Sequence, residues 1–486
     1  MSALGQLSAI RPVQSFITTL LGPLQPSCPP LPLPKRAMIL ELPDELLWGI
    51  FSRCMDPHSS PFSTENPLWP LMKVCVRWRN VILDAPQFWR HISFPDWRKR
   101  GRVENLEQDA ARVSQQVENS GEVPVTINLI PIPGSDAVVD TLLTTSTRVE
   151  AANLVLDKHL LQRFSSHAEG FPILSKLVVQ LSEKLEESEE KAAANFFGGL
   201  QALTNLSVTS EVAVDWVPVL VPLQTMWSQL RVCELTESVV DDVLFILPHL
   251  SPGTRLALIL GHLRRTEEVD TLPIIDHCNI QSLSFDRCGD EFVSLILGRI
   301  TAPSLQRLAI WWFNRSPHLD TITAMLQRSS ASLTHFAMRL LCANAARRQG
   351  LDGDTMVALF EFLNSEHVRD LIDLDLTLVS RYTPPTLELL DALAGVPNPW
   401  EPDLKLPTLP KLRSLALRAY DEEDGEWERR LLAIAAKRTP VFRSLWLDDP
   451  LLNPSLGHRA LKNLRQKLEK HGVELVCSYD GDMGTW

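Results

Sequence analysis

A short pattern of apolar residues recurs along the larger part of this sequence and constrains its fold more than any other feature. Nine windows fit the order apolar-x-x-apolar-x-apolar, and their starts lie 25 to 50 residues apart. A short strand followed by a helix cannot bury its apolar face alone, so neighbouring copies must stack and share one core. The windows are LSKLVV from Leu174, LTNLSV from Leu203, LRVCEL from Leu230, IQSLSF from Ile280, LQRLAI from Leu305, LTHFAM from Leu333, LIDLDL from Leu371, LRSLAL from Leu412 and FRSLWL from Phe442.

The alternation of side chains along a strand gives each window a direction. We expect its fourth and sixth residues to enter the core, and its third, fifth and seventh to face outward from a parallel sheet. A weak copy, GTRLAL from Gly253, lies near the middle of the 50-residue gap. The pattern predicts a curved solenoid, with an ordinary α/β domain as the alternative. Between the windows, the sequence predicts helices at residues 241–250, 291–300, 320–328, 354–363, 386–394 and 425–437.

These windows resemble leucine-rich repeats. In that family the ninth residue is an Asn or Cys whose side chain bonds to backbone along the stack. Here only IQSLSFDRC supplies such a residue, Cys288. We therefore expect an irregular leucine-rich-repeat-like solenoid over residues 154–486.

An aromatic-rich block precedes the repeats. Pro43, Asp44 and Glu45 suit the first turn of a helix, because proline tolerates that position and acidic residues favour the positive end of the helix dipole. A turn-rich insert at 56–67 separates this helix from a second helical stretch, and a short third element follows at 85–89. So small a core leaves apolar surface uncovered, as a partner-binding module requires. The apolar stripes are Leu46, Leu47, Ile50, Phe51 and Cys54 on the first helix and Leu68, Met72, Cys75, Trp78 and Ile82 on the second.

Three blocks of this region resemble an F-box: LPDELLWGIF at 42–51, VCVRWR at 74–79 and LDAPQFWRHI at 83–92. The implied fold class is α/β, with a small three-helix F-box-like domain followed by the solenoid and its curved parallel sheet. The resemblance also implies a substrate-receptor subunit of an SCF-type ubiquitin ligase, whose F-box docks on a Skp-type adaptor and through it on a cullin. The downstream repeats would then hold the protein to be ubiquitinated.

Carried over residue by residue, the resemblance gives a set of adaptor-facing candidates. Some of them must instead hold the three helices together, and Ile50, Phe51 and Trp78 suit either role. The insert at 56–67 departs from the family pattern and leaves open how the first two helices pack. The candidates are Leu42, Pro43, Leu46, Leu47, Ile50, Phe51, Val74, Cys75, Trp78, Pro86 and Trp89.

Outward strand positions supply candidates for binding the target protein. Trp and Arg most often dominate the binding energy of protein interfaces, which selects Trp311, Arg339, Arg418 and Trp446. Each has an ordinary structural alternative, because a tryptophan can pack between repeats and a surface arginine can pair with an acidic neighbour.

Searches for catalytic motifs find none. The sequence lacks G-x-S-x-G, H-E-x-x-H, G-x-x-x-x-G-K-[ST] and G-x-G-x-x-G. We therefore expect no enzyme activity, no cofactor and no metal. His277-Cys278 lies near Cys288, but its apolar neighbours Ile275 and Ile280 favour buried structural thiols. The net charge of −12 argues against a nucleic-acid partner. Two alternatives stay open: a leucine-rich-repeat scaffold outside any ligase, its helical block capping the first strand, and an enzyme of another fold.

Composition and patterning divide the chain into four parts. These are a flexible proline-rich leader (1–37), an F-box-like helical domain (38–95), a linker helix with a first capping strand (96–153), and the solenoid (154–486). An alternating run at 123–130 predicts the capping strand. No apolar run approaches the roughly 20 residues that cross a bilayer. We therefore expect no membrane partner. Eight cysteines without a C-x-x-C pair indicate reduced thiols, which predicts a location in the cytoplasm or nucleus.

Overall fold

The computed structural model divides the chain into two compact units, Met1–Leu154 and Val155–Trp486. Every helix in the described part of the chain is too short or too polar to span a membrane. The described residues are 42–54, 66–93, 106–130, 136–182, 185–210, 224–263, 273–312, 319–341, 353–379, 384–396, 409–419, 426–448 and 457–478.

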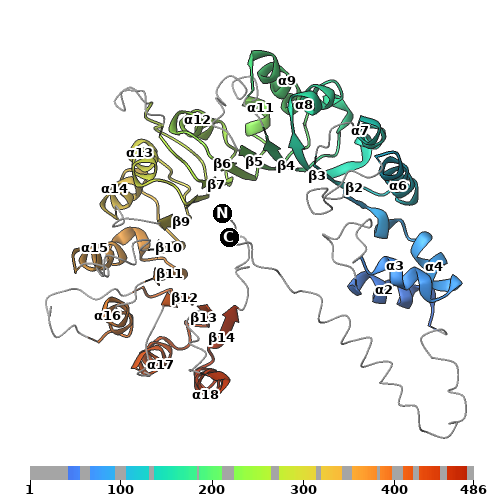
Figure 1. Ribbon diagram of the computed structural model, residues 1–486. Coiled ribbons are helices and arrows are strands. Elements are labelled where there is room, and N and C mark those ends of the chain that lie inside the picture. The colour runs from blue at the N-terminus through green and yellow to red at the C-terminus, as the bar shows by residue number, and fades with distance from the viewer. Residues whose placement is uncertain are drawn as a thin grey trace, which may run out of the picture. The chain divides into compact units, whose positions relative to one another are not determined.

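The first unit begins with a small helical domain (Figure 1). It contains α2 (Asp44–Cys54), α3 (Leu68–Val74), α4 (Val76–Leu83) and the 3-10 helix η2 (Pro86–Trp89). Because α2 and α3 share the core through Leu47 and Leu68, they pack together despite the insert between them. The core consists of Leu47, Phe51, Leu68, Trp78, Ile82, Ala85, Phe88 and Trp89.

The second helical stretch predicted from the sequence is two helices. Cys75 separates α3 from α4 with extended backbone, at φ −160° and ψ 168°. Its Sγ accepts a hydrogen bond from the Trp78 N–H at 3.5 Å and so caps the start of α4. The prediction of one continuous helix is wrong because this cap interrupts a stripe whose residues all look helical in spacing.

The rest of the first unit builds on the end of the helical domain. It contains β1 (His91–Ser93), α6 (Leu106–Asn119), β2 (Val125–Leu129), α7 (Asp136–Leu143), η3 (Ser146–Arg148) and the first part of β3 (Val149–Leu156). The three strands pair in parallel, and β2 confirms the strand predicted at 123–130. Buried Gln116 on α6 donates through Nε2 to the carbonyls of Trp89 (3.2 Å) and His91 (2.5 Å).

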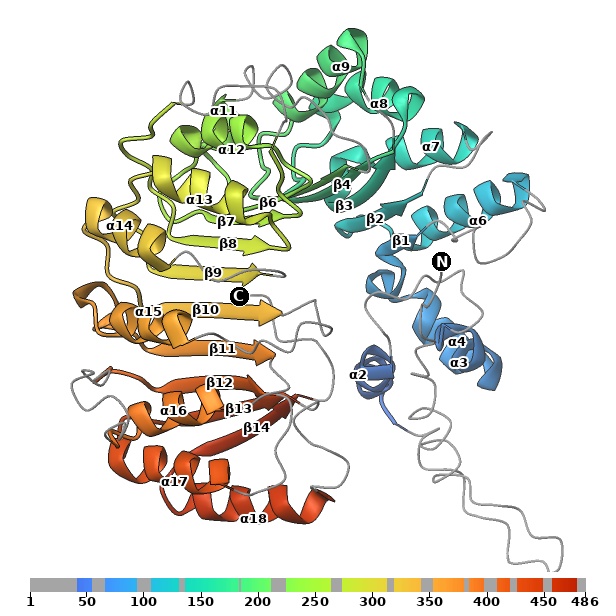
Figure 2. The ribbon, with the colours of Figure 1, turned by 60° about the vertical axis from the view of Figure 1, so that its left-hand side comes forward.

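The second unit is a stack of strand-helix repeats. Each strand pairs in parallel with its neighbours in sequence, as a solenoid requires. Its sheet curves, with strands lining the inside of the arc and helices the outside (Figures 1 and 2). The strands are β4 (Lys176–Leu181), β5 (Asn205–Ser210), β6 (Val232–Thr236), β7 (Arg255–Ile259), β8 (Ser282–Asp286), β9 (Arg307–Trp312), β10 (His335–Leu341), β11 (Asp373–Val379), β12 (Ser414–Ala419), β13 (Ser444–Asp448) and β14 (Glu474–Ser478).

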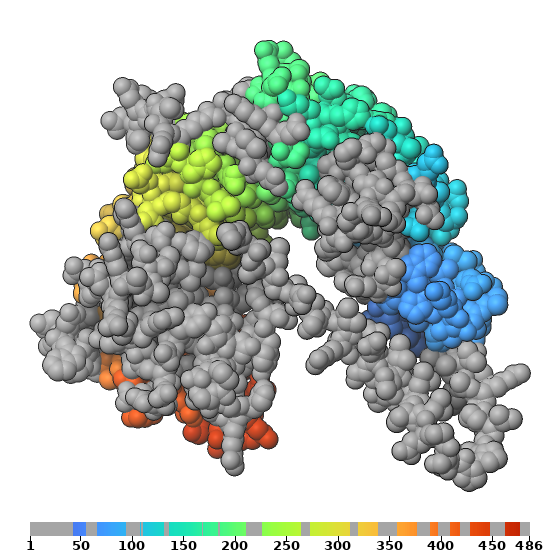
Figure 3. All heavy atoms as spheres, viewed as in Figure 1, coloured from blue at the N-terminus to red at the C-terminus, as the bar shows by residue number. Residues whose placement is uncertain are grey.

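The outer helices of this unit follow the strands along the chain. In the space-filling view the colour of this unit runs from teal through green and yellow as successive repeats follow one another (Figure 3). The helices are α8 (Lys158–Ser165), η4 (Ala168–Gly170), α9 (Glu187–Gly198), α11 (Gln224–Trp227), α12 (Val240–Ile246), η6 (Leu247–His249), α13 (Asp290–Arg299), α14 (Leu319–Ser329), α15 (Gly353–Leu363), η8 (Glu366–Val368), α16 (Pro384–Leu393), α17 (Glu426–Arg438) and α18 (Gly457–Glu469).

The strand positions confirm the predicted windows. Every window becomes a strand that starts at the window's third residue, and the weak copy from Gly253 becomes β7. The fourth and sixth residues are buried throughout, as Leu283 and Phe285 illustrate at 0% and 1% exposure. Several outward fifth positions are buried as well: Ala309, Ala337, Asp375 and Ala416.

The turn after β8 shows how the repeats interlock. Cys288 Sγ accepts the Gly261 N–H at 3.2 Å and donates to the Leu258 carbonyl at 3.3 Å, which confirms the backbone-bonding role of the ninth residue. Burial raises the pKa of the Cys288 thiol to about 12, so it stays protonated. Gly261 is the ninth residue of the preceding copy, which starts at Gly253. A Cβ at Gly261 would overlap the buried ring of Phe292, so that copy cannot carry a larger ninth residue without moving the ring.

Candidate functional site

The helical domain exposes large apolar side chains on all three of its α-helices. Leu46, Val74 and Val76 are 56%, 55% and 67% exposed. Exposed apolar side chains at this density, on so small a domain, are typical of a surface that a partner covers. The exposed apolar set comprises Leu46, Trp48, Ile50, Trp69, Val74, Val76 and Leu83.

Burial separates the sequence-predicted adaptor candidates into three groups. Four belong to the core and hold the helices together: Leu47, Phe51, Trp78 and Trp89. Four are exposed: Pro43, Leu46, Ile50 and Val74. Three are half-buried: Leu42, Cys75 and Pro86.

Four members of the exposed apolar set were not among the candidates predicted from the sequence: Trp48, Trp69, Val76 and Leu83. A signal for Trp48 is present in α2. A surface helix needs an apolar stripe about 100° wide, whereas α2 carries apolar residues around most of its circumference. Leu47 and Phe51 fill the core, and the surplus remains in solvent.

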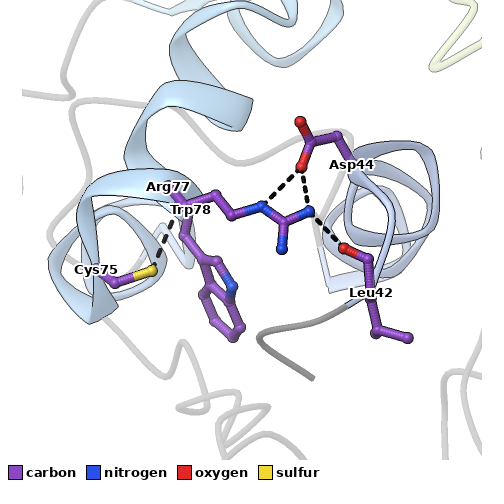
Figure 4. A network of polar contacts seen from close by, with 5 residues as sticks. All are labelled: Leu42, Asp44, Cys75, Arg77 and Trp78. Carbon is purple, nitrogen blue, oxygen red and sulfur yellow. Dashed lines mark hydrogen bonds and ion pairs between the residues drawn. The ribbon is translucent and has the colours of Figure 1, made fainter. Parts of the chain in front are cut away.

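An ion pair fixes the start of α2 against α4 (Figure 4). Arg77 donates to Asp44 Oδ1 from Nη2 at 2.6 Å and from Nε at 3.0 Å, and Nη2 also donates to the Leu42 carbonyl at 2.5 Å. Beside this network lies an open hollow whose lining includes Trp48 and Val76. The network therefore joins the start of α2 to α4 at the edge of this hollow.

Comparison with known families assigns this region. A family model for F-box-like domains matches residues 39–95. The chain carries an F-box-like domain. A domain of this kind indicates an adaptor role in ubiquitin ligation and typically binds a Skp-type adaptor. F-box proteins are in general non-catalytic substrate receptors. No curated protein matches the chain.

The second candidate surface is the inner face of the repeat sheet. An open groove extends over β4–β9, and Trp311 lies at its β9 end. We call this hollow the concave groove. Its lining includes Lys176, Val178, Asn205, Ser207, Val232, Glu234, Arg255, Ala257, Ile259, Ser282, Ser284, Asp286, Ala309 and Trp311.

Register places the four predicted target-binding residues on this one face of the sheet. Trp311 on β9 lies opposite Arg339 on β10, and the same row continues through Thr377 to Arg418 on β12. Trp446 on β13 occupies a fifth position opposite Ala416 and is 36% exposed. Trp311 lines the concave groove.

Cys278 and Cys233 are buried thiols, and the burial of Cys278 and Cys288 agrees with the prediction from the sequence. Burial raises the pKa of Cys278 to about 11 and that of Cys233 to about 12, so both thiols are protonated near neutral pH. Within the described ranges, no group of three or more His, Cys, Asp or Glu residues is placed to hold a metal ion.

Proposed function

We propose that this chain is a non-catalytic substrate receptor of an SCF-type ubiquitin ligase. Its F-box-like domain docks on a Skp-type adaptor and through it on a cullin, and its repeats hold a target protein. The observation that carries the proposal is the exposed apolar set within the segment that matches the F-box-like family. In this proposal residues 1–37 are a leader, 38–95 the docking domain, 96–153 a linker, and 154–486 the target-binding solenoid, and the protein works in the cytoplasm or nucleus.

The docking surface consists of the accessible members of the predicted set together with Trp48 and Val76, the two added side chains that line the hollow beside the ion pair. Removing such apolar area from water contributes roughly 25 cal/mol per Å², and Trp and other large side chains dominate such interfaces. The proposed contacts are Leu42, Pro43, Leu46, Trp48, Ile50, Val74, Cys75, Val76 and Pro86.

Capture of a purified Skp-type adaptor by the full chain tests this proposal. We expect the wild-type chain to retain the adaptor. Leu46→Asp and Val74→Asp should each weaken capture at least tenfold, because the complex would bury an unpaired carboxylate. Ile274→Asp is the matched control: Ile274 is 67% exposed but belongs to the second unit.

Two results would contradict the proposal: a wild-type chain that does not retain the adaptor, or an Ile274→Asp variant that loses it as fully as Leu46→Asp. Leu47→Asp is unsuitable as a surface probe, because Leu47 is 0% exposed and a charge there disrupts the core. It serves instead to show what an unfolded docking domain does in the assay.

The alternative is a scaffold that acts outside any ligase. It is favoured by the two hydrogen bonds from Gln116 on α6 to Trp89 and His91, which fit a helical block that caps the first strand. Failure of adaptor capture by a folded wild-type chain would select this alternative.

A further inference from the structure

The concave groove has an asymmetric charge distribution along one edge of its strands. The third residues of consecutive repeats form a continuous row from β4 to β9. This row contains three cations and no anion, in a chain whose net charge is −12. Its members are Lys176, Asn205, Val232, Arg255, Ser282 and Arg307.

These three cations have no anionic partner in the described part of the chain, whereas Asp286, one of the two acidic residues in the groove lining, has a cationic partner. Asp286 pairs with Arg287 at 3.5 Å, and Glu234 accepts a hydrogen bond from Ser207 at 3.2 Å. Both acidic residues occupy other rows of the sheet. The row of third residues therefore presents positive charge to whatever enters the groove.

From this arrangement we propose that the concave groove binds an extended, acidic peptide segment of the target protein. Its carboxylates pair with Lys176 and Arg255 in the lining, and with Arg307, which lies outside the lining but in register with the lining residue Ser282. The inference deepens the proposed target-binding role, because it specifies the charge and spacing of the bound segment. Guanidinium groups favour carboxylates through bidentate, charge-assisted hydrogen bonds. Trp311 lines the groove at β9, four residues along the strand from Arg307, and offers an apolar contact away from the last carboxylate.

The register sets the spacing of those carboxylates. Neighbouring strands lie about 4.8 Å apart, so Lys176 and Arg255 are separated by about 14 Å and Arg255 and Arg307 by about 10 Å. An extended peptide rises about 3.3 Å per residue. Only residues an even number of positions apart face the same side of an extended peptide, so the matching segment carries acidic residues four positions apart in both gaps. In the second gap this spacing exceeds the distance between Arg255 and Arg307 by about 3 Å, which the long Glu and Arg side chains span.

Fluorescence polarisation with a labelled peptide and the full chain tests the inference. The probe is a twelve-residue peptide with three glutamates at those spacings, compared with versions that carry glutamine or lysine at the same positions. We expect the glutamate peptide to bind and to weaken as salt rises. The glutamine version should bind at least tenfold more weakly, and the lysine version not at all.

Charge reversal in the protein locates the site. Arg255→Glu should weaken the glutamate peptide at least tenfold and should restore binding to a peptide with lysine at the middle position. Arg443→Glu is the matched control, because Arg443 is exposed and lies before β13, outside the lining of the groove. Its binding should match that of the wild type.

Several outcomes would overturn the inference. These are equal binding of the glutamate and glutamine peptides, equal losses in Arg255→Glu and Arg443→Glu, binding only when phosphoserine replaces glutamate, or tighter binding of a single-stranded oligonucleotide of the same charge. Adaptor capture is measured on the same variants. Retained capture with failed peptide binding would refute this inference alone and leave the ligase role standing.

Discussion

The helical domain exposes more large hydrophobic side chains for its length than the repeat unit does. Of the thirteen large hydrophobic side chains exposed among the described residues, seven lie in the helical domain and six are spread along the repeat unit. The repeat unit is several times longer. Stacking lets each repeat cover its neighbour, whereas three short helices cannot cover all of their apolar surface.

This comparison assigns different binding chemistry to the two regions. The helical domain offers apolar area, which associates strongly and depends little on salt. The inner face of β4–β9 offers ordered polar and charged side chains, which give specificity more than raw affinity. A receptor that keeps one constant partner and selects another needs both kinds of surface.

The largest expected effect is a loss of stability confined to the helical domain. Phe51 is fully buried and packs edge-to-face against Trp78, with ring centroids 5.0 Å apart. Phe51→Ala should cost about 3–5 kcal/mol of unfolding free energy, because it removes the ring and leaves a cavity. Hydrogen exchange in urea should show α2–α4 opening at lower denaturant while β4–β14 stay protected. If both regions opened together, the two would form one cooperative unit and the comparison would fail.

A second change disturbs the repeat unit alone. Gly261→Ala places a methyl group against the buried ring of Phe292 and should cost about 1–3 kcal/mol through overpacking. The urea midpoint of the repeat unit should fall, and adaptor capture should stay at the wild-type level. Adding Phe292→Leu should recover part of the loss. No recovery would show that backbone conformation, rather than the ring, requires the glycine.

Alkaline pH should destabilise the repeat unit through its buried thiols. Burial raises the pKa of Cys233 from 9.0 to about 12, so the folded state holds a proton that the unfolded state loses above pH 9. The stabilisation is complete below pH 9 and disappears as pH rises toward 12, at up to about 1.4 kcal/mol per pH unit for each thiol. Between pH 8 and 10.5, the free energy of unfolding from denaturation curves should therefore fall less steeply with pH for Cys233→Ser than for the wild type. An unchanged slope would contradict the burial of this thiol.

The smallest expected effect concerns the ion pair of the helical domain. Asp44 and Arg77 have side chains 62% and 40% exposed, so water screens most of their attraction. Asp44→Asn should change the unfolding free energy by less than about 1 kcal/mol and leave adaptor capture within threefold of the wild type. Thermal unfolding in low and high salt measures this. A larger loss would mean that the network positions α2 for docking.

The repeat pattern was readable from the sequence because every copy carries large apolar residues at fixed positions. Two of the strands that the windows missed, β3 and β14, show its limit. In β3 a small residue, Ala152, takes a core position that a larger apolar residue fills in the windows. Before β14, Gly472 stands where the other windows begin with an apolar residue.

In the helical domain the sequence located the docking segment but did not separate core from surface. Leu46 and Leu47 are adjacent leucines, yet one is 56% exposed and the other is fully buried. The break at Cys75 changes which residues face inward along α3 and α4, and no local sequence pattern predicts this break. Lys176, Arg255 and Arg307 are each the third residue of a window, so the sequence already predicts the same outward position for them. The structure adds the strand register that joins them in one row.

Hydrogen–deuterium exchange of the full chain, with and without a purified Skp-type adaptor, tests the central claim most directly. The account predicts new protection in α2, α3 and α4, around Leu46 and Val74, with exchange in β4–β14 unchanged. Protection confined to the repeat strands, or no change anywhere at saturating adaptor, would contradict it.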